Sequence, residues 1–297
     1  MARMRGLIAL LVALAGAPLA LPPGGLRAQA PPLPDRDSFL AEVQKRLASN
    51  DIIQSRYSYR QRSTELNLNP FGRIGTGPVL VQEVYPHPDD KLTYRRLVER
   101  DGRPLSAAEI AEQDRAYLER LDAWNRRTAR EGESARRLRL QRAREGRERD
   151  EARAREALEM FDFAIAGRDT WEGQPAIVIS FTPRPDAQPR TREGRIARAF
   201  EGRAWVHEHE YEVMNVEATA IDDVSFGFGI IAKLHAGSTA KFVRRRIDGR
   251  WLPVESRFDG TGRALLVRKV VINFWREYSD YRPFEPDELP ARLGLGR

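Results

Sequence analysis

The sequence contains no cysteine, and only four of its 297 residues are histidine. The lack of cysteine excludes disulfide bonds, thiolate zinc sites, a cysteine nucleophile and lipid attachment through an amino-terminal cysteine. Stability must therefore come from a packed core. A chain of this length can bury one, since an all-β domain of about 200 to 250 residues can form a single unit.

Long apolar runs are also lacking, because nothing after the first thirty residues approaches the ~20 apolar residues that a membrane-spanning helix requires. The first thirty residues have the pattern of a secretory signal peptide: Arg3 and Arg5 precede an apolar segment at 7–21, and a small-residue cleavage site follows at 28–30. We expect a periplasmic protein that is not integral to the membrane. Because Pro31 directly follows the cleavage site, an uncleaved leader that anchors the chain is the alternative.

Motifs of catalysis are missing as well. The sequence has no Gly-rich phosphate loop, nucleophile elbow or zinc-protease motif, so we predict no enzyme activity and no cofactor. His207 and His209 are a weak metal candidate, since residues two apart on a strand face the same side and two imidazoles there suit a divalent metal. A third ligand is lacking, so we predict a strand end or turn and no bound metal.

Short runs of alternating apolar and polar residues make up most of the chain, as in half-buried β-strands. Before them a helix is predicted over 38–48, with Asp37 as its cap and Asn50 as its stop. Asp248-Gly249 is a strong hairpin signal. No helix longer than a turn or two interrupts the last hundred residues, so the sheet must be antiparallel. The predicted strands are 56–60, 79–85, 92–98, 161–165, 177–181, 203–208, 211–221, 239–247, 251–258 and 264–276.

A helical insertion over 106–158 interrupts this series of strands. Ser106 and Glu109 form a capping box, which predicts a helix that begins at Ala107. Its first turns carry one apolar face that should dock, whereas from Arg126 onward only small residues and two leucines are apolar, so we expect that part to project into solvent. Glycines at 132 and 146 predict bends or breaks there. The docking face consists of Ile110, Tyr117, Leu121 and Trp124.

Most of the positive charge lies in this insertion. Between Arg126 and Glu156 there are twelve arginines and seven acids, an excess of five out of the net +7 of the whole chain. Acids at helical spacing from arginines predict a solvated helix with internal charge pairs. The alternative is a surface for anionic lipid headgroups or an acidic protein, and export argues against nucleic acid. The residues of that surface would be Arg136, Arg137, Arg142 and Arg149.

Three short segments carry a resemblance to a known family. They are Gly202-Arg203-Ala204-Trp205-Val206, Gly249-Arg250-Trp251-Leu252-Pro253 and Tyr278-Ser279-Asp280-Tyr281, in a chain ordered as leader, short helix, three strands, helical segment and a long run of strands. From about 38 to 284 the chain resembles bacterial periplasmic proteins with the lipoprotein-carrier (LolA/LolB-like) fold. The Arg/Glu-rich helical insertion departs from the carriers, so we expect a separate branch of this family.

The resemblance implies a mainly β (α+β) fold, an open antiparallel half-barrel of about 10–11 strands with short covering helices and the long charged insertion. It implies one domain over 38–284. The residues themselves predict a signal peptide (1–30) and a Pro-rich lead-in (31–37) before that domain, and a tail (285–297) that is loose because it is Pro-rich and short of apolar residues. It also implies a cavity for a lipid, a lipoprotein segment or a hydrophobic peptide. A filled core, with a structural or regulatory role through an envelope partner, is the alternative. The candidate cavity residues are Tyr57, Tyr59, Phe226, Phe228, Ile230 and Ile231.

Overall fold

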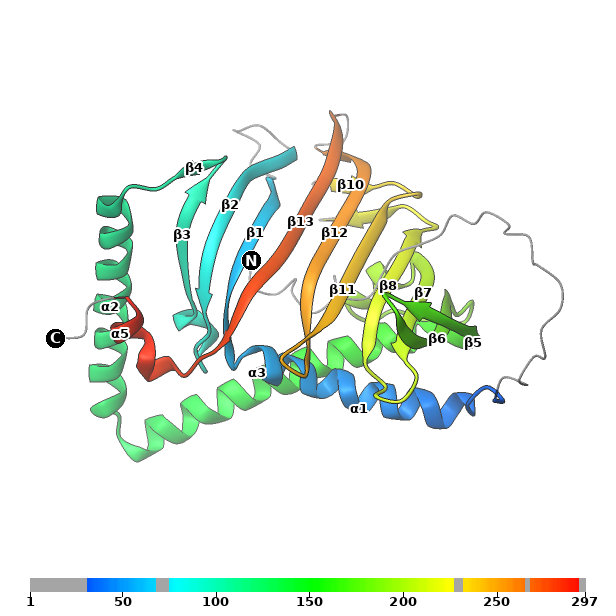
Figure 1. Cartoon of the computed structure of the whole chain (residues 1–297), viewed down its shortest axis with the longest axis horizontal. Coiled ribbons are helices and arrows are strands. Elements are labelled where there is room, and N and C mark those ends of the chain that lie inside the picture. The colour runs from blue at the N-terminus through cyan, green and yellow to red at the C-terminus, as the bar shows by residue number, and fades with distance from the viewer. Residues whose placement is uncertain (1–30, 68–74, 227–231, 265–267, 294–297) are drawn as a thin grey trace.

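The computed structural model describes residues 31–67, 75–226, 232–264 and 268–293. Thirteen strands in these ranges join one antiparallel sheet (Figure 1). They are β1 (Tyr57–Asn67), β2 (Gly75–Tyr85), β3 (Tyr94–Arg100), β4 (Arg103–Pro104), β5 (Phe161–Trp171), β6 (Gln174–Pro183), β7 (Phe200–His207), β8 (Val213–Ala220), β9 (Val224–Phe226), β10 (Ala232–Leu234), β11 (Thr239–Ile247), β12 (Arg250–Ala264) and β13 (Arg268–Pro283).

The strand order places the end of the chain beside its beginning. The order is β4-β3-β2-β1-β13-β12-β11-β8-β7-β6-β5, so the long β13 pairs with β1 and joins two meanders into one sheet. The sheet is open, with β4 and β5 at its two edges, and the short β10 and β9 lie off this path. The predicted open antiparallel half-barrel is therefore confirmed.

Tight turns of one type connect several of these strands. Asp248 and Gly249, between β11 and β12, have φ angles of 47° and 75°. Two positive φ values in succession define the two-residue turn that matches the twist of antiparallel strands, and glycine adopts such angles without strain. Glu172-Gly173 joins β5 to β6 with the same geometry. The hairpin predicted at Asp248-Gly249 is confirmed.

The first helix, α1 (Arg36–Gln54), is longer than predicted at both ends. The carboxylate of Asp35, not Asp37, accepts the backbone N–H of Ser38 at 3.0 Å, which moves the cap two residues earlier. Asn50 does not stop the helix, which continues for one further turn.

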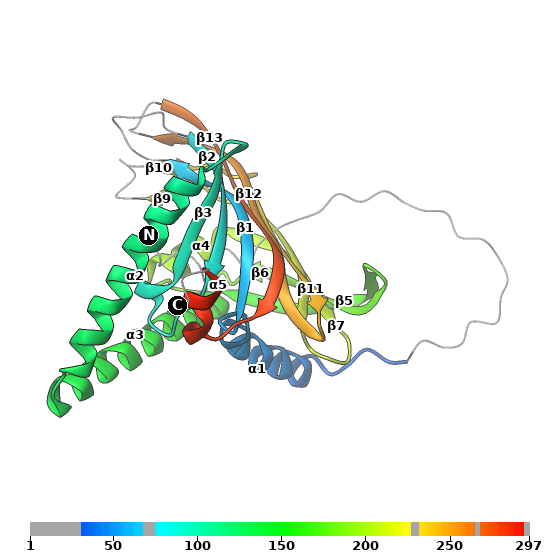
Figure 2. The same cartoon turned by 60° about the vertical axis from the view of Figure 1, so that its left-hand side comes forward.

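The insertion forms two helices, α2 (Ala107–Ala129) and α3 (Glu133–Glu159). The capping box is present, with the Glu109 backbone N–H donating to the Ser106 hydroxyl and the Ser106 N–H donating to the Glu109 carboxylate. Gly132 separates the two helices, whereas Gly146 lies inside α3 without a break. Figure 2 shows α2 and α3 meeting in a V.

The insertion connects opposite edges of the sheet, since β4 precedes it and β5 follows it. At about 1.5 Å per residue, the 27 residues of α3 reach ~40 Å. In Figure 1, α3 accordingly runs across the lower end of the sheet to reach β5. The expected projection into solvent is wrong in this respect: most α3 side chains are exposed, but the helix is a crossover that is attached at both ends.

The carboxyl-terminal tail is not loose as far as Leu293. After β13 come a 3-10 helix, η4 (Pro286–Glu288), and a short helix, α5 (Leu289–Arg292). Phe284 and Leu289 are 4% and 2% exposed, and they pack in one cluster with Tyr94 and Tyr117 of β3 and α2. Burial of Leu289 against Phe284, which directly precedes the predicted tail, outweighs the polar composition from which a loose tail was predicted.

Candidate ligand-binding face

One face of the sheet is covered by helices at the β5 side. A row of directly paired residues crosses this face, and its middle members are small. Phe39 of α1, Met160 after α3 and Ala197 of α4 (Arg192–Ala197) belong to the same buried cluster as that row. This end of the face is therefore a filled core. The row is Phe163, Phe181, Gly202, Ala218, Ala240, Phe258 and Phe274.

The same face continues across β12, β13, β1 and β2 with a different composition. A second row of paired residues begins with apolar Val216 and Phe242 but becomes polar at Ser256, Arg276 and Ser63. Ser63 and Ser256 are 2% and 7% exposed. A filled apolar core rarely places such residues in one line. We call this half of the face, with Tyr59, Gln61, Ser63, Leu80, Arg276 and Tyr278, the open floor.

Aromatic side chains form the lower part of the open floor. The ring centroids of Tyr59 and Tyr278 are 5.7 Å apart, and those of Tyr59 and Tyr281 are 5.3 Å apart. Tyr57 meets Tyr281 edge-on at 6.2 Å. The Tyr281 hydroxyl donates to the Pro253 carbonyl at 2.7 Å, and burial raises the pKa of Tyr281, so it stays protonated.

Two of the six predicted cavity residues therefore lie together on or beside this floor, namely Tyr57 and Tyr59, and both are partly exposed. Phe226 ends β9, which pairs with β10. The other three, Phe228, Ile230 and Ile231, lie outside the described residues.

The opposite face of the sheet is charged. Arg62 pairs with Glu277 at 3.2 Å, and its guanidinium lies 4.7 Å from the centroid of the Trp275 ring. Lys241 pairs with Glu255 at 3.4 Å across β11 and β12. Alternation in an antiparallel sheet puts such residues towards solvent and their neighbours towards the helices.

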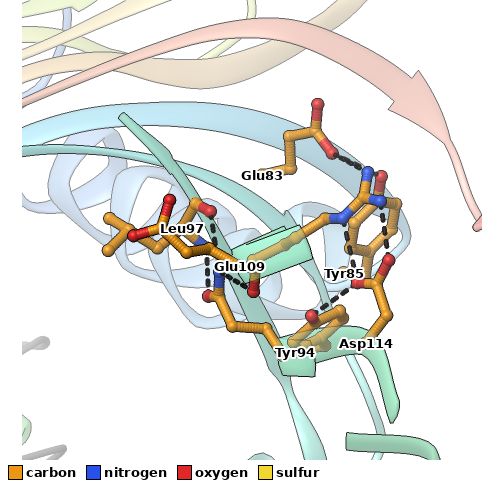
Figure 3. A network of polar contacts seen from close by, with 8 residues as sticks. Glu83, Tyr85, Tyr94, Leu97, Glu109 and Asp114 are labelled. Atoms are coloured by element: carbon orange, nitrogen blue, oxygen red, sulfur yellow. Dashed lines mark hydrogen bonds and ion pairs between the residues drawn. The ribbon is translucent and has the colours of Figure 1, made fainter. Parts of the chain in front are cut away.

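A buried carboxylate fastens α2 to the edge of the sheet (Figure 3). Asp114 is 4% exposed and accepts three hydrogen bonds: from the Tyr94 hydroxyl at 2.7 Å and from Nε and Nη2 of Arg96 at 2.9 and 2.7 Å. Arg96 also pairs with Glu83 at 3.2 Å. Burial, with the nearby Glu83, raises the pKa of Tyr85 to about 12. The docking predicted for the first turns of this helix is confirmed, and Tyr117 stacks on Tyr94 at 4.2 Å.

Gln113 of α2 also holds the edge strand. Its side-chain amide donates to the Leu97 carbonyl at 3.2 Å, and its carbonyl accepts the Leu97 N–H at 3.1 Å. This reciprocal pair (Figure 3) occupies backbone groups that an exposed strand edge would offer to another chain.

A second buried carboxylate fastens the far end of α3. Glu156 is 5% exposed and accepts the backbone N–H groups of Arg190 and Thr191, in the loop before α4. A Cβ on Gly194 would lie 2.9 Å from Oε1 of Glu156, so this contact requires glycine. The charged insertion is thus fixed at both ends by a carboxylate and exposed between them.

The histidine pair lies at the end of β7 and in the following turn. His207 is 6% exposed, and its Nδ1 accepts the backbone N–H groups of His209 and Glu210 at 3.3 and 3.2 Å. That nitrogen is occupied in shaping the turn. The ring centroids are 6.1 Å apart, and no three metal-binding side chains gather anywhere in the described part of the chain.

This arrangement predicts a pH dependence of stability. Burial lowers the pKa of His207 below its ordinary value of 6.5, so the folded state binds this proton less readily than the unfolded chain does. The contribution of His207 should be complete above pH 6.5 and lost as the pH falls below that value and through the lowered folded-state pKa. Urea unfolding at pH 7.5 and 5 should show less pH dependence in His207→Asn. The exposed His209→Asn variant should behave like the native chain, and an unchanged pH dependence in His207→Asn would contradict this role.

The four arginines predicted as a partner surface lie on exposed parts of α3 but not on one side of it. At 100° per residue, Arg136 lies within about 20° of Arg147 around the helix, whereas Arg137 and Arg142 lie about 100° and 120° from Arg136 and point to other sides. Arg149 lies with Arg142 and is 4.0 Å from Glu145, and Arg137 is 3.9 Å from Glu133. Charge pairs at helical spacing are therefore present, as predicted.

No helix in the described ranges combines the length and apolarity needed to cross a bilayer.

The fold and site define an open antiparallel sheet with one face covered by helices, and this face is an apolar filled core at the β5 side and partly polar beyond it. No protein-family profile and no curated protein matches the chain. Similar solved structures include a DUF1329 family protein from Desulfovibrio piger (11% identity, 87% of this chain and 99% of that chain, TM-score 0.27). They also include a LolA superfamily protein from Nitrosomonas europaea (9% identity, 85% and 96%, TM-score 0.27).

A third similar structure is a domain described as outer membrane lipoprotein-sorting, from Vibrio parahaemolyticus (9% identity, 88% of this chain and 100% of that domain, TM-score 0.31). These neighbours include the superfamily whose fold the sequence resembles. At such low identity and TM-score they carry no argument about ligand or activity, so the function is argued below from the residues of this chain.

Proposed function

We propose that this chain is an exported binding protein that holds an apolar segment, such as an acyl chain of a lipid or lipoprotein, on the open floor. The binding requires no catalysis. The helices complete an apolar core at the β5 side, whereas Tyr59, Leu80 and Tyr278 stay partly exposed on the same face and would contact the ligand. The periplasmic location follows from the leader-like first thirty residues, which lie outside the described part of the chain.

The observation that supports the proposal is the partial exposure of apolar side chains on the covered face. Tyr59, Leu80 and Tyr278 point to the same side as the core, are partly exposed, and belong to none of the three apolar clusters of the described residues. Partly exposed apolar surface inside a concave, helix-covered sheet is typical of a ligand site. Arg276, which is partly exposed on the same face, would meet the polar end of such a ligand.

A charge on the open floor should abolish this binding. Tyr278→Glu places a carboxylate where the acyl chain would lie, and desolvating an unpaired carboxylate costs several kcal/mol, so we expect at least a roughly tenfold loss of affinity for a fluorescent long-chain fatty acid. Ser279→Glu is the matched control, since it adds the same charge one residue away on the opposite, exposed face. Equal affinity of the two variants would refute the proposed site.

A second role, docking through α3, is favoured by one observation. One side of the helix, called the α3 stripe below, carries Arg136, Leu140, Arg144 and Arg147 in succession. Leu140 is 52% exposed. Arg136 and Arg147 have no acidic partner among the described residues. Basic side chains around an exposed leucine suit an anionic membrane surface.

Removal of charge from this side of α3 should weaken binding to anionic vesicles. At about 1 kcal/mol per arginine near an anionic surface, Arg136→Gln with Arg147→Gln should lower the affinity for phosphatidylglycerol-containing vesicles about thirtyfold. Arg142→Gln with Arg149→Gln removes the same charge from another side and should have a smaller effect. If both double variants lost the same vesicle affinity in a sedimentation assay, total charge would determine binding and the α3 stripe, which carries Arg136 and Arg147, would not.

A further inference from the structure

The structure contains a hollow at the lower end of the sheet, next to the aromatic end of the open floor, because Tyr57 lines it and contacts Tyr281. Its volume is about 430 Å³. Three segments that are distant in the sequence form it: the turn between α1 and β1, the hairpin between β11 and β12, and the link from β13 to η4. The lining residues are Ile53, Arg56, Tyr57, Arg250, Pro283, Phe284, Glu285 and Glu288.

Backbone contacts fix the shape of this hollow. The Arg56 N–H donates to the Ile53 carbonyl at 3.2 Å, which closes the turn after α1. The Phe284 N–H donates to the Arg56 carbonyl at 2.9 Å, which ties the end of β13 to the start of β1. Phe284 is 4% exposed and anchors the link. The hollow therefore lies between fixed segments.

The charges that line the hollow are of both signs. Arg56 and Arg250 are exposed, and neither has an acidic partner among the described residues. Glu285 likewise has no cationic partner there, whereas Glu288 pairs with Arg292 at 2.7 Å. Arg56, Arg250 and Glu285 thus line the same hollow as the less polar Ile53, Tyr57 and Pro283.

From this combination we infer that the hollow binds the phosphoethanolamine headgroup of a lipid. Guanidinium groups form paired hydrogen bonds with phosphate oxygens, and a carboxylate accepts hydrogen bonds from a primary ammonium group. A purely anionic headgroup would satisfy Arg56 and Arg250 but would meet Glu285 with like charge. A choline headgroup has no N–H to donate to Glu285, so it would leave that carboxylate without a hydrogen bond. The apolar wall would contact the glycerol part.

This inference goes beyond the proposed acyl binding and is tested without acyl chains. Glycerophosphoethanolamine, which has the headgroup and no tail, is titrated into the full chain and followed by amide NMR shifts. We expect saturable shifts at residues of the hollow, with weaker binding of glycerophosphocholine and glycerophosphoglycerol. The titration uses a probe without an acyl chain, so its result does not depend on whether the native chain binds fatty acid. Either proposal can therefore be refuted while the other stands.

Variants decide which groups recognise the probe. Arg56→Gln with Arg250→Gln should weaken glycerophosphoethanolamine binding about tenfold or more, and Glu285→Gln should weaken it while leaving glycerophosphoglycerol unaffected or bound more tightly. Arg115→Gln, at an exposed position of α2 outside every proposed site, is the control for loss of charge and should change nothing. Absence of binding, equal binding of all three probes, or binding that is unchanged in the double arginine variant would overturn the inference, and amide spectra of each variant would verify its fold.

Discussion

Gly202→Val should be the most destabilising single substitution on the covered face. A Cβ at this position would lie 2.2 Å from the backbone oxygen of Glu217 and 2.6 Å from the Cα of Ala218 on the neighbouring strand. Both are backbone atoms of a paired strand and cannot move aside without breaking the β7–β8 pairing. We expect a loss of at least about 3 kcal/mol in the free energy of unfolding, measured by urea denaturation.

Gly146→Ala is the matched control for that substitution. Gly146 lies inside α3, where an added Cβ would meet only the end of the Arg149 side chain at 4.0 Å. Because alanine is favoured over glycine in a helix interior, this variant should gain up to about 1 kcal/mol. If Gly202→Val were as stable as the native chain, the pairing of β7 with β8 would have to differ from that described.

Asp114→Ala should have the second largest effect. It removes the acceptor of three hydrogen bonds and leaves Arg96, whose side chain is only 19% exposed, paired with Glu83 alone. Breaking one side of a buried pair typically costs about 3–5 kcal/mol, because the remaining charge stays desolvated. The loss should be accompanied by faster amide exchange in α2, since this contact fastens the helix to β3.

An exposed ion pair on the same helix provides the comparison. Asp122 pairs with Arg126 at 2.6 Å, but both side chains are about 60% exposed. Asp122→Ala should therefore cost less than about 1 kcal/mol. Similar losses for Asp114→Ala and Asp122→Ala, or α2 exchange that is unchanged in Asp114→Ala, would show that the carboxylate does not anchor the helix.

Local features of the fold were predictable from the sequence because their signals lie within a few residues. Ser106 and Glu109 are three residues apart and define a helix start, and Asp248-Gly249 defines a hairpin by itself. The path of α3 was not predictable in this way. It follows from β13 pairing with β1, a contact between segments more than 200 residues apart, which puts β4 and β5 at opposite edges.

The candidate site was only partly predictable for the same reason. Tyr57 and Tyr59 are recognisable in a single strand, but the polar line of Ser63, Ser256 and Arg276 exists only once three strands are aligned. Asp114 had a local signal that was not used. It lies at helical spacing between Ile110 and Tyr117, and a charged residue inside an apolar stripe indicates a buried partner.

Native mass spectrometry with lipid extraction tests the central claim most directly, using protein expressed with its own leader and purified from the periplasm. The account predicts a co-purifying acyl lipid or lipoprotein on the native chain and on Ser279→Glu, and its loss from Tyr278→Glu. A ligand-free mass for the native chain, together with no binding of added fatty acid, would contradict the account.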